Sequence, residues 1–361
     1  MMIDNIIQWF QTWLPFNVHI SLLFFTAVLF AALMIFAIMA INALAAVYAE
    51  RKVSAFMQDR IGPMGQGPGL HAGKWGLLQT VADALKLLLK EDIIPTTADK
   101  KIFIIAPFII FLGAFIALAA IPFGPQILVA DMNIGIFYIL AVSSFGIIGM
   151  ILAAWSSDNK WSLFGGMRSA AQIISYEIPA ALSLVSVLIL TSTLSMQGII
   201  QSQSGTVWGY LPNWNIFNNP FTFLACFIYF IAGVAETNRT PFDIPEAESE
   251  LVAGFHTEYS GMRWAFFFLS EYGNMLVVCG VTVVAFLGGW QSPIDGRMTG
   301  PVWGIFWFLT KLTATIFIMI WFRWTFPRLR VDQLMNIAWK ILLPIALFNL
   351  FGVGIWTLLV K

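Results

Sequence analysis

The chain alternates long apolar runs with short polar segments along most of its length. Eight runs approach the ~20 consecutive apolar residues that a helix needs to cross the hydrocarbon core of a bilayer. They predict spanning helices at roughly 18–48, 102–122, 134–155, 171–194, 221–236, 264–288, 302–322 and 341–360. The first run is long, the fifth is short, and no internal repeat is evident. The pattern predicts one helical membrane domain over residues 1–361.

Two further stretches have one apolar and one polar face, which is typical of helices that lie on a membrane surface. The first stretch is 3–14 and the second is 75–90. Polar residues of the second stretch recur at helical spacing and form a single stripe. They are Gln79, Asp83, Lys86 and Lys90. Either the stripe is exposed, with Asp83 paired to Lys86, or it faces an enclosed polar cavity.

Composition agrees with a membrane location. The chain is 59% hydrophobic and 11% charged, with a mean hydropathy of +0.82, whereas soluble domains are about 25% charged. We therefore expect an all-α polytopic membrane protein. Cys226 and Cys279 fall inside separate apolar runs, so the sequence offers no cysteine cluster for zinc or iron–sulfur. The first residues lack the basic segment of a signal peptide.

Basic residues predict the orientation of the bundle. Sixteen of the nineteen lie in the segments 50–101, 156–170, 236–264 and 323–340. Arg297 and Lys361 lie on the opposite side of the membrane in this prediction, and Lys311 falls inside an apolar run. Because cytoplasmic loops carry the excess of lysine and arginine, we expect both termini on the periplasmic side. The loops 49–101 and 237–263 are then cytoplasmic and hold most of the polar motifs.

Three ionisable side chains fall inside apolar runs, which a simple membrane anchor does not need. Glu177 and Glu271 are placed several residues inside their runs, and Lys311 is near the middle of the seventh. A charge at this depth costs a few kcal/mol, so such residues usually face a partner or a water-filled cavity. A buried neutral or snorkelling side chain is the structural alternative. No acid on the same run can pair with Lys311, so we expect Glu271 or Glu236 as its partner.

The polar segment after the fifth run is unusually acidic. Residues 235–263 hold six of the nineteen acids, namely Glu236, Asp243, Glu246, Glu248, Glu250 and Glu258. Asp243 and Glu246 fit a helix capping box around Pro245, which accounts for two of them. Carboxylates this close together cannot all ionise cheaply where water is scarce, so the protonation of one depends on the others. Such a cluster, joined to buried acids and a lysine, fits a proton path.

These motifs together resemble the family of the H subunit of respiratory complex I (NADH-quinone oxidoreductase), the equivalent of mitochondrial subunit 1. The resemblance covers nearly the whole chain. It rests on ERK (50–52), GLLQ and AD…K…KE (76–91), RSAAQ and SYE (168–177), AETNRTPFD (235–243), ESELVAGF…EYSG (248–261), EY (271–272) and PR-R-DQLM…WK (327–340). It implies a membrane-arm subunit with eight spans that encloses a quinone chamber together with peripheral-arm subunits.

The resemblance also implies roles for individual residues, none of them catalytic or metal-binding. Four would line the quinone path: Arg51, Phe268, Arg323 and Arg328. The polar route for protons would contain Asp83, Lys86, Glu177, Glu236, Glu246, Glu248, Glu250, Glu258, Glu271, Tyr272 and Lys311. Some members of the family carry a carboxylate in the third span, where this chain has Ser143 and Ser144.

The implied cofactors and partners follow the same resemblance. Quinone, either ubiquinone or menaquinone, would be the substrate, while FMN and iron–sulfur clusters would belong to partner subunits of the complex. The expected location is the bacterial inner (plasma) membrane, with the mitochondrial inner membrane as the alternative, and nucleic acid is not an expected partner. A related subunit of a membrane-bound hydrogenase remains the alternative function. A secondary transporter is disfavoured because its inverted repeats are missing.

Overall fold

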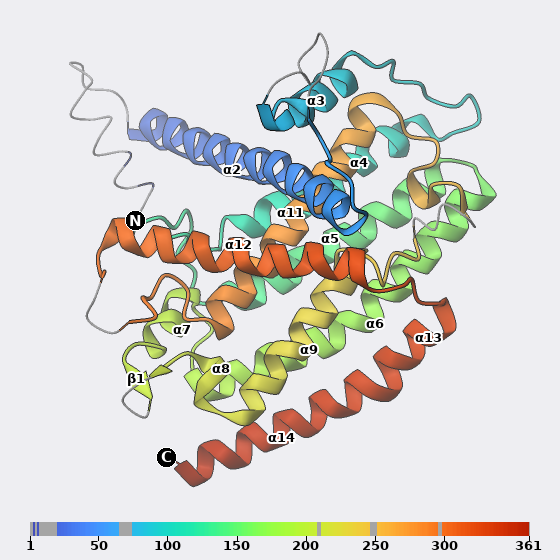
Figure 1. The fold of residues 1–361 in the computed structure, drawn as a ribbon. Coiled ribbons are helices and arrows are strands. Elements are labelled where there is room, and N and C mark those ends of the chain that lie inside the picture. Colours follow the sequence, from blue (N-terminus) through green and yellow to red (C-terminus); the bar gives the residue numbers. More distant parts are fainter. Residues whose placement is uncertain are drawn as a thin grey trace.

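The computed structural model describes residues 20–64, 74–207, 211–245, 251–294 and 298–360, together with Ile3 and Ile6. This part of the chain folds into a bundle of long helices (Figure 1). The long helices are α2 (Ile20–Met57), α4 (Lys100–Leu118), α5 (Gly135–Ser156), α6 (Lys160–Thr191), α9 (Pro220–Glu236), α11 (Gly261–Phe286), α12 (Pro301–Thr325) and α14 (Leu343–Val360).

Short elements connect the long helices. They are η1 (Lys74–Gly76), α3 (Gln79–Leu89), α7 (Met196–Ser202), β1 (Thr206–Val207), β2 (Leu211–Pro212), α8 (Asn215–Asn218), η2 (Gly254–His256), α13 (Val331–Asn336) and η3 (Ile337–Leu342). The segment η3 is π-helical and joins α13 to α14 without a break. The strands β1 and β2 pair antiparallel in a two-residue register. They are the one departure from an all-helical chain among the described residues.

Seven helices in the described part are long and apolar enough to cross a membrane. The all-α polytopic prediction is therefore confirmed. The predicted fifth span corresponds to α9, which has 17 residues. At 1.5 Å per residue this helix is about 26 Å long, slightly less than the ~30 Å of a hydrocarbon core.

Several helices extend beyond the apolar runs that predict them. The helix α2 continues to Met57, and α6 already begins at Lys160. Their polar turns hold the side chains discussed below, and hydrophobicity alone does not detect these turns. The amphipathic stretch 75–90 contains α3, as expected. The surface helix predicted over 3–14 lies outside the described residues, apart from Ile3 and Ile6.

The helix α11 occupies the centre of the bundle. It packs against α2, α4, α9 and α12, and it is the most buried of the seven long candidate spans. Glycines permit two of these close contacts, because a Cβ on Gly273 would collide with Met39 and a Cβ on Gly233 would collide with Val278. The side chains of Glu271 and Tyr272 are thereby held in the interior, next to the contact between α11 and α2.

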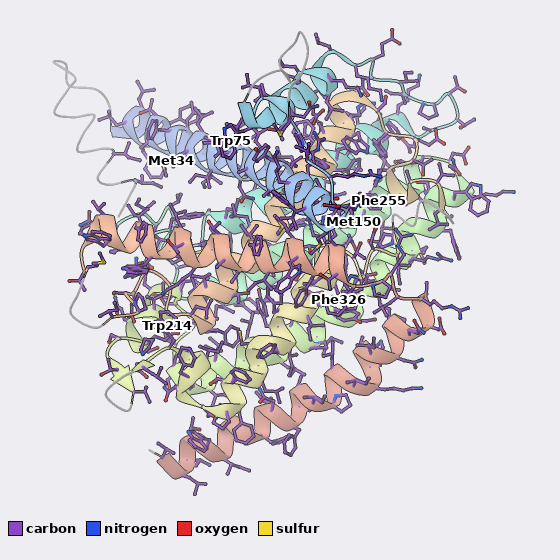
Figure 2. All side chains as sticks on the ribbon, in the orientation of Figure 1. Met34, Trp75, Met150, Trp214, Phe255 and Phe326 are labelled. Atoms are coloured by element: carbon purple, nitrogen blue, oxygen red, sulfur yellow. The ribbon has the colours of Figure 1, made fainter. Side chains whose placement is uncertain are left out.

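The bundle has two distinct ends. In Figure 1, α7, α8, β1 and the end of α14 lie at one end, whereas α13 and the end of α12 lie at the other. Figure 2 shows Trp214 near the first end and Met150 with Phe255 away from it. The outer faces carry large apolar side chains, such as Phe25 and Phe351, which are 64% and 70% exposed. Such faces suit contact with lipid.

Candidate functional site

Arg239 is the centre of the candidate site. It follows the end of α9, is 1% exposed, and is among the largest fully buried side chains among the described residues. Its Nη1 lies 3.1 Å from Oε2 of Glu50, and its Nη2 lies 3.0 Å from Oε1 of Glu271. Its guanidinium carbon lies 4.5 Å from the centre of the Tyr272 ring. Burial alone would lower the pKa of Arg239, but the carboxylates of Glu271 and Glu50 outweigh burial and raise it.

Glu50 binds side chains from several parts of the chain. Besides Arg239, it accepts a hydrogen bond of 2.7 Å from the Tyr272 hydroxyl and forms an ion pair with Arg323 of α12. Glu50, Arg239, Glu271, Tyr272 and Arg323 are called the central charge cluster below. Two carboxylates face two guanidinium groups in this cluster, so its formal charges balance. Balance of this kind is what allows charges to remain in a poorly hydrated interior.

An outer cavity of about 570 Å³ borders the central charge cluster. Its walls include Arg51 from α2, Phe268 from α11 and Arg323 from α12, together with Glu50 and Tyr272. The structure therefore brings together three of the four residues predicted for the quinone path. The fourth, Arg328, is absent from this wall. Its Nη2 lies 3.1 Å from Oδ2 of Asp243 instead.

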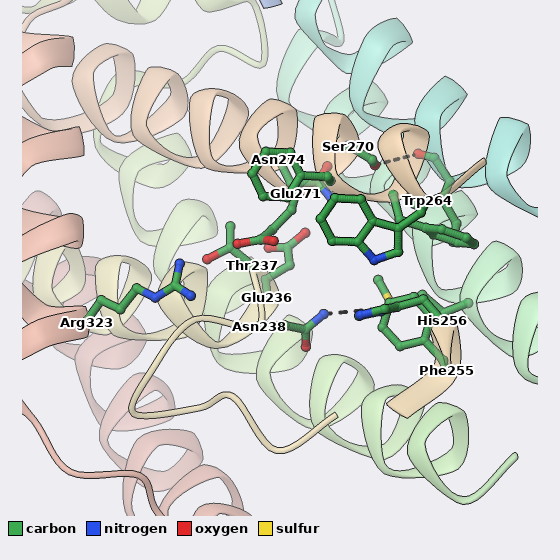
Figure 3. A pocket seen from close by; sticks show the side chains of 14 residues that line it. Glu236, Thr237, Asn238, Phe255, His256, Trp264, Ser270, Glu271, Asn274 and Arg323 are labelled. Atoms are coloured by element: carbon green, nitrogen blue, oxygen red, sulfur yellow. Dashed lines mark hydrogen bonds between the residues drawn. The ribbon is translucent and has the colours of Figure 1, made fainter. Parts of the chain in front are cut away.

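An inner cavity of about 230 Å³ lies on the other side of the same side chains. Its walls include the carboxylates of Glu236 and Glu271 and the imidazole of His256. Figure 3 shows the two carboxylates next to each other, with Arg323 directed toward them from one side and His256 on the other. Phe268 and Arg323 line both cavities, so they stand between the outer and the inner space.

One side-chain amide bridges the two sides of the loop that carries Arg239. Nε2 of Gln172, which is buried on α6, donates to the carbonyls of Ala235 at 2.8 Å and Phe242 at 2.7 Å. The next acid of this loop is Asp243, which lies outside the membrane-spanning helices. Burial raises the pKa of Asp243 to about 6, although Arg328 and Arg323 lower it. The carboxyl of Asp243 therefore ionises near pH 6.

The first polar loop contacts α2 and α11. Arg51 forms an ion pair with Asp83 at 2.6 Å, and Nε2 of Gln79 donates to Asp83 at 3.3 Å. Lys86 is exposed and makes no ion pair with Asp83 among the described residues. Of the two alternatives for this stripe, the one with Asp83 paired to Lys86 is therefore wrong. Asp83 instead binds Arg51, which lines the outer cavity, while Lys86 and Lys90 are exposed.

The remaining predicted acids are more scattered. Glu258 accepts a hydrogen bond of 2.6 Å from Asn159 at the start of α6. Glu177 is half-buried on α6. Glu246, Glu248 and Glu250 lie outside the described residues. The capping box that pairs Asp243 with Glu246 is likewise outside them.

Lys311 is held in a different way from the one expected. Its Nζ donates to three carbonyl oxygens, those of Leu287 at 2.7 Å, Gly289 at 2.9 Å and Gln291 at 2.8 Å. It also lies 4.1 Å from the centre of the Trp214 ring. Among the described residues no carboxylate pairs with it, so the expected pairing with Glu271 or Glu236 is wrong. The ammonium stabilises the carboxyl end of α11, where the helix dipole favours a cation.

Sequence reasoning missed two residues of the central charge cluster. The sequence pattern assigns Glu50 only to the polar end of the first span, and it assigns Arg239 to the many cytoplasmic basic residues. The available signal is the placement of Arg239 between Glu236 and Asp243, in an acidic segment next to an apolar run. Among the described residues, no group of three histidine, cysteine, aspartate or glutamate side chains is placed to hold a metal ion.

Comparison with known proteins gives one consistent family. Residues 30–354 match the family described as NADH dehydrogenase. The chain is 53% identical over 320 residues to the H subunit of NADH-quinone oxidoreductase from Chlorobaculum tepidum, a match that covers 86% of this chain and 87% of that protein. It is 52% identical over 306 residues to the same subunit from Anoxybacillus flavithermus, covering 84% and 86% of the two chains.

Proposed function

The chain belongs to the H-subunit family of NADH-quinone oxidoreductase (complex I), and we propose that it walls the quinone site and couples quinone reduction to proton translocation. As a member of this family, it is a multi-pass membrane subunit of an enzyme complex, and its partners are the other complex I subunits. The family name of the relatives favours this function over the hydrogenase alternative.

We propose the outer cavity as the binding place of the quinone head group. A quinone head group is a flat ring with two carbonyl oxygens, so it requires apolar contact and a few hydrogen-bond donors. Phe268 and Trp324 offer aromatic surface, and Arg51 and Arg323 offer charged donors, all on the wall of a space of about 570 Å³. Arg328 contributes indirectly in this proposal, through the loop that holds Asp243.

In this proposal the central charge cluster links quinone reduction to the movement of protons. Reduction of a quinone consumes two electrons and two protons, and the electrons would come from an iron–sulfur cluster in a partner subunit. Proton uptake next to Glu50 and Tyr272 would change the charge that Arg239 and Arg323 experience. Because Arg239 also binds Glu271, this change reaches the inner cavity and Glu236 without movement of the quinone itself.

The other predicted acids extend this route in the proposal. Glu177 would continue it along α6, while Glu246, Glu248, Glu250 and Glu258 would supply protons from the loop side. Asp83 and Lys86 would tune the entrance through Arg51. We place the chain in the bacterial inner membrane, with the end of the bundle that holds α7 and the end of α14 on the periplasmic side.

Exchange of Phe268 tests the quinone assignment. Replacing Phe268 with Leu in the complete complex removes aromatic contact from the outer cavity and should raise the apparent KM for a short-chain quinone about three- to tenfold. Phe266→Leu is the matched control, because Phe266 lies on the same helix but packs against Phe108 and Phe111. Electron transfer from NADH to ferricyanide should remain unchanged in both variants. An equal KM in the two variants would contradict the assignment.

A further inference from the structure

His256 is a half-buried side chain that the quinone site does not use. It is the last residue of η2 and lines the inner cavity. Its ring is packed among aromatic neighbours, with centroid distances of 4.9 Å to Phe255 and 6.3 Å to Trp264. This packing fixes the position of the imidazole. Its Nδ1 is buried and has no hydrogen-bond partner among the described residues.

Glu236 is a half-buried side chain in the same cavity. Its carboxylate is on the cavity wall at the end of α9. Among the described residues it makes no hydrogen bond or ion pair, in contrast to Glu271, which binds Arg239. A buried polar group without a protein partner is normally satisfied by ordered water. The buried Nδ1 of His256 and the half-buried carboxylate of Glu236 come from elements far apart in the chain and face the same space, so water in this space can bind both.

The cavity has the size and lining that water needs. A water molecule occupies about 30 Å³ in the liquid, so about 230 Å³ holds several. The wall also presents Asn238, Ser270 and Asn274, which can each hold a water by hydrogen bonds. Among the described residues, Glu236, Glu271 and Arg323 are the titratable or charged groups that face this space besides His256.

We propose that His256 is a positioning residue of the inner cavity, whose Nδ1 binds the water that links it to Glu236 and Glu271. This inference rests on the proposed function, because it concerns how protons reach the carboxylates of the coupling route. Burial lowers the pKa of His256 to about 4, so the imidazole is neutral at pH 7. A neutral imidazole holds water without adding a charge that would compete with Arg239 for the carboxylates.

Three variants of the complete complex distinguish the roles of the two ring nitrogens of His256. His256→Asn places a polar atom close to the position of Nδ1, His256→Gln places one close to Nε2, and His256→Phe retains only the ring shape. We expect His256→Phe and His256→Gln to lower NADH-driven proton pumping about five- to tenfold and to shift its pH profile. His256→Asn should retain most of the wild-type rate. Ile110→Leu, an apolar exchange on the same wall, is the control.

The outcomes are distinct from those of the quinone test. The apparent KM for quinone should stay at the wild-type value in all His256 variants, because His256 does not line the outer cavity. Assembly is checked by electron transfer from NADH to ferricyanide. Wild-type pumping and pH profile in His256→Phe would overturn the inference, as would equal impairment in His256→Asn and His256→Phe. A high-resolution map of the unmodified complex provides a mutation-free test, and a dry cavity around Nδ1 would also overturn it.

Discussion

Arg239 illustrates how single residues organise this protein. Its Nη1 and Nη2 form ion pairs with two carboxylates from different helices, those of Glu50 and Glu271. Removing one member of a buried set of charges typically costs roughly 3–5 kcal/mol, because the remaining charge loses its partner. The same reasoning explains why Arg323 approaches Glu50 from α12. The set therefore holds α2, α11 and α12 together with the loop of Arg239, and in the proposed function it also responds to charge in the outer cavity.

Asp243 gives a pH-dependent prediction for a single side chain. Its pKa is raised to about 6, so the folded protein keeps the carboxyl protonated in a range where the unfolded chain has already ionised. The resulting stabilisation is complete below about pH 4 and is lost as the pH rises through about 6. A protonated-carboxyl band in the infrared spectrum of the complex should disappear over the same pH range and be missing in Asp243→Asn.

The partner of Asp243 supplies the control. Arg328 lowers the pKa of Asp243, so Arg328→Gln should move the infrared transition to higher pH. The heat-inactivation temperature of the wild type, relative to Asp243→Asn, should decrease between pH 5 and pH 7. A transition that stays in place in Arg328→Gln would mean that the two side chains do not interact as the structure indicates.

Among the helices, α11 connects the central charge cluster with the site of Lys311. Glu271 and Tyr272 lie near the middle of the helix, and its carboxyl end is held by Lys311 of α12. Three hydrogen bonds to carbonyls and the Trp214 ring satisfy this ammonium. We therefore interpret Lys311 as an anchor of the segment after α11 and not as half of an ion pair with Glu271.

Lys311→Met tests this interpretation. The change leaves three carbonyl groups without their donor, which should cost on the order of 3 kcal/mol. Amide hydrogen exchange of residues 287–291 should accelerate, and the complex should inactivate at a lower temperature. Lys340→Met is the control, because Lys340 is exposed on η3. If the double variant Lys311→Met with Glu271→Gln recovered the wild-type stability, the two side chains would be a pair after all.

In the molecule as a whole, the two ends of the bundle differ in charge. Sixteen of nineteen basic residues lie in the segments that the sequence places in the cytoplasm. The described ion pairs of Arg51, Arg239, Arg263, Arg323 and Arg328 all come from these segments. Positive charge that holds a protein in one orientation thus also provides partners for the acids of the candidate site.

Labelling of introduced cysteines tests the orientation. Ser204 follows α7 and Thr97 precedes α4, and both are exposed at opposite ends of the bundle. In spheroplasts, whose inner membrane is intact, a membrane-impermeant maleimide should label Ser204→Cys and leave Thr97→Cys unlabelled. Inverted vesicles should give the reverse. The native thiols give little background, because Cys226 and Cys279 are 8% and 0% exposed. Labelling of both sites from the same side would contradict the eight-span arrangement.

The order of residues along the chain was enough to establish the class of this protein and its main elements. Apolar runs of membrane length predict spanning helices because lipid leaves backbone groups no partner outside the helix. The same local signal predicted the short α9 and the amphipathic α3. The resemblance to a known family, and not this local signal, implied a shared role for Arg51, Phe268 and Arg323, which the fold brings to one cavity.

Which charges meet depends on the three-dimensional arrangement of the helices. Glu50 and Arg239 are 189 positions apart, and Glu50 and Tyr272 are 222 apart, so no local pattern links them. Lys311 shows the other limit, because its acceptors are backbone carbonyls, and every residue has one. An ion-pair partner leaves a trace in the sequence as an acid or a base, whereas a carbonyl leaves none. The surroundings of this lysine therefore follow from the position of a helix end in space.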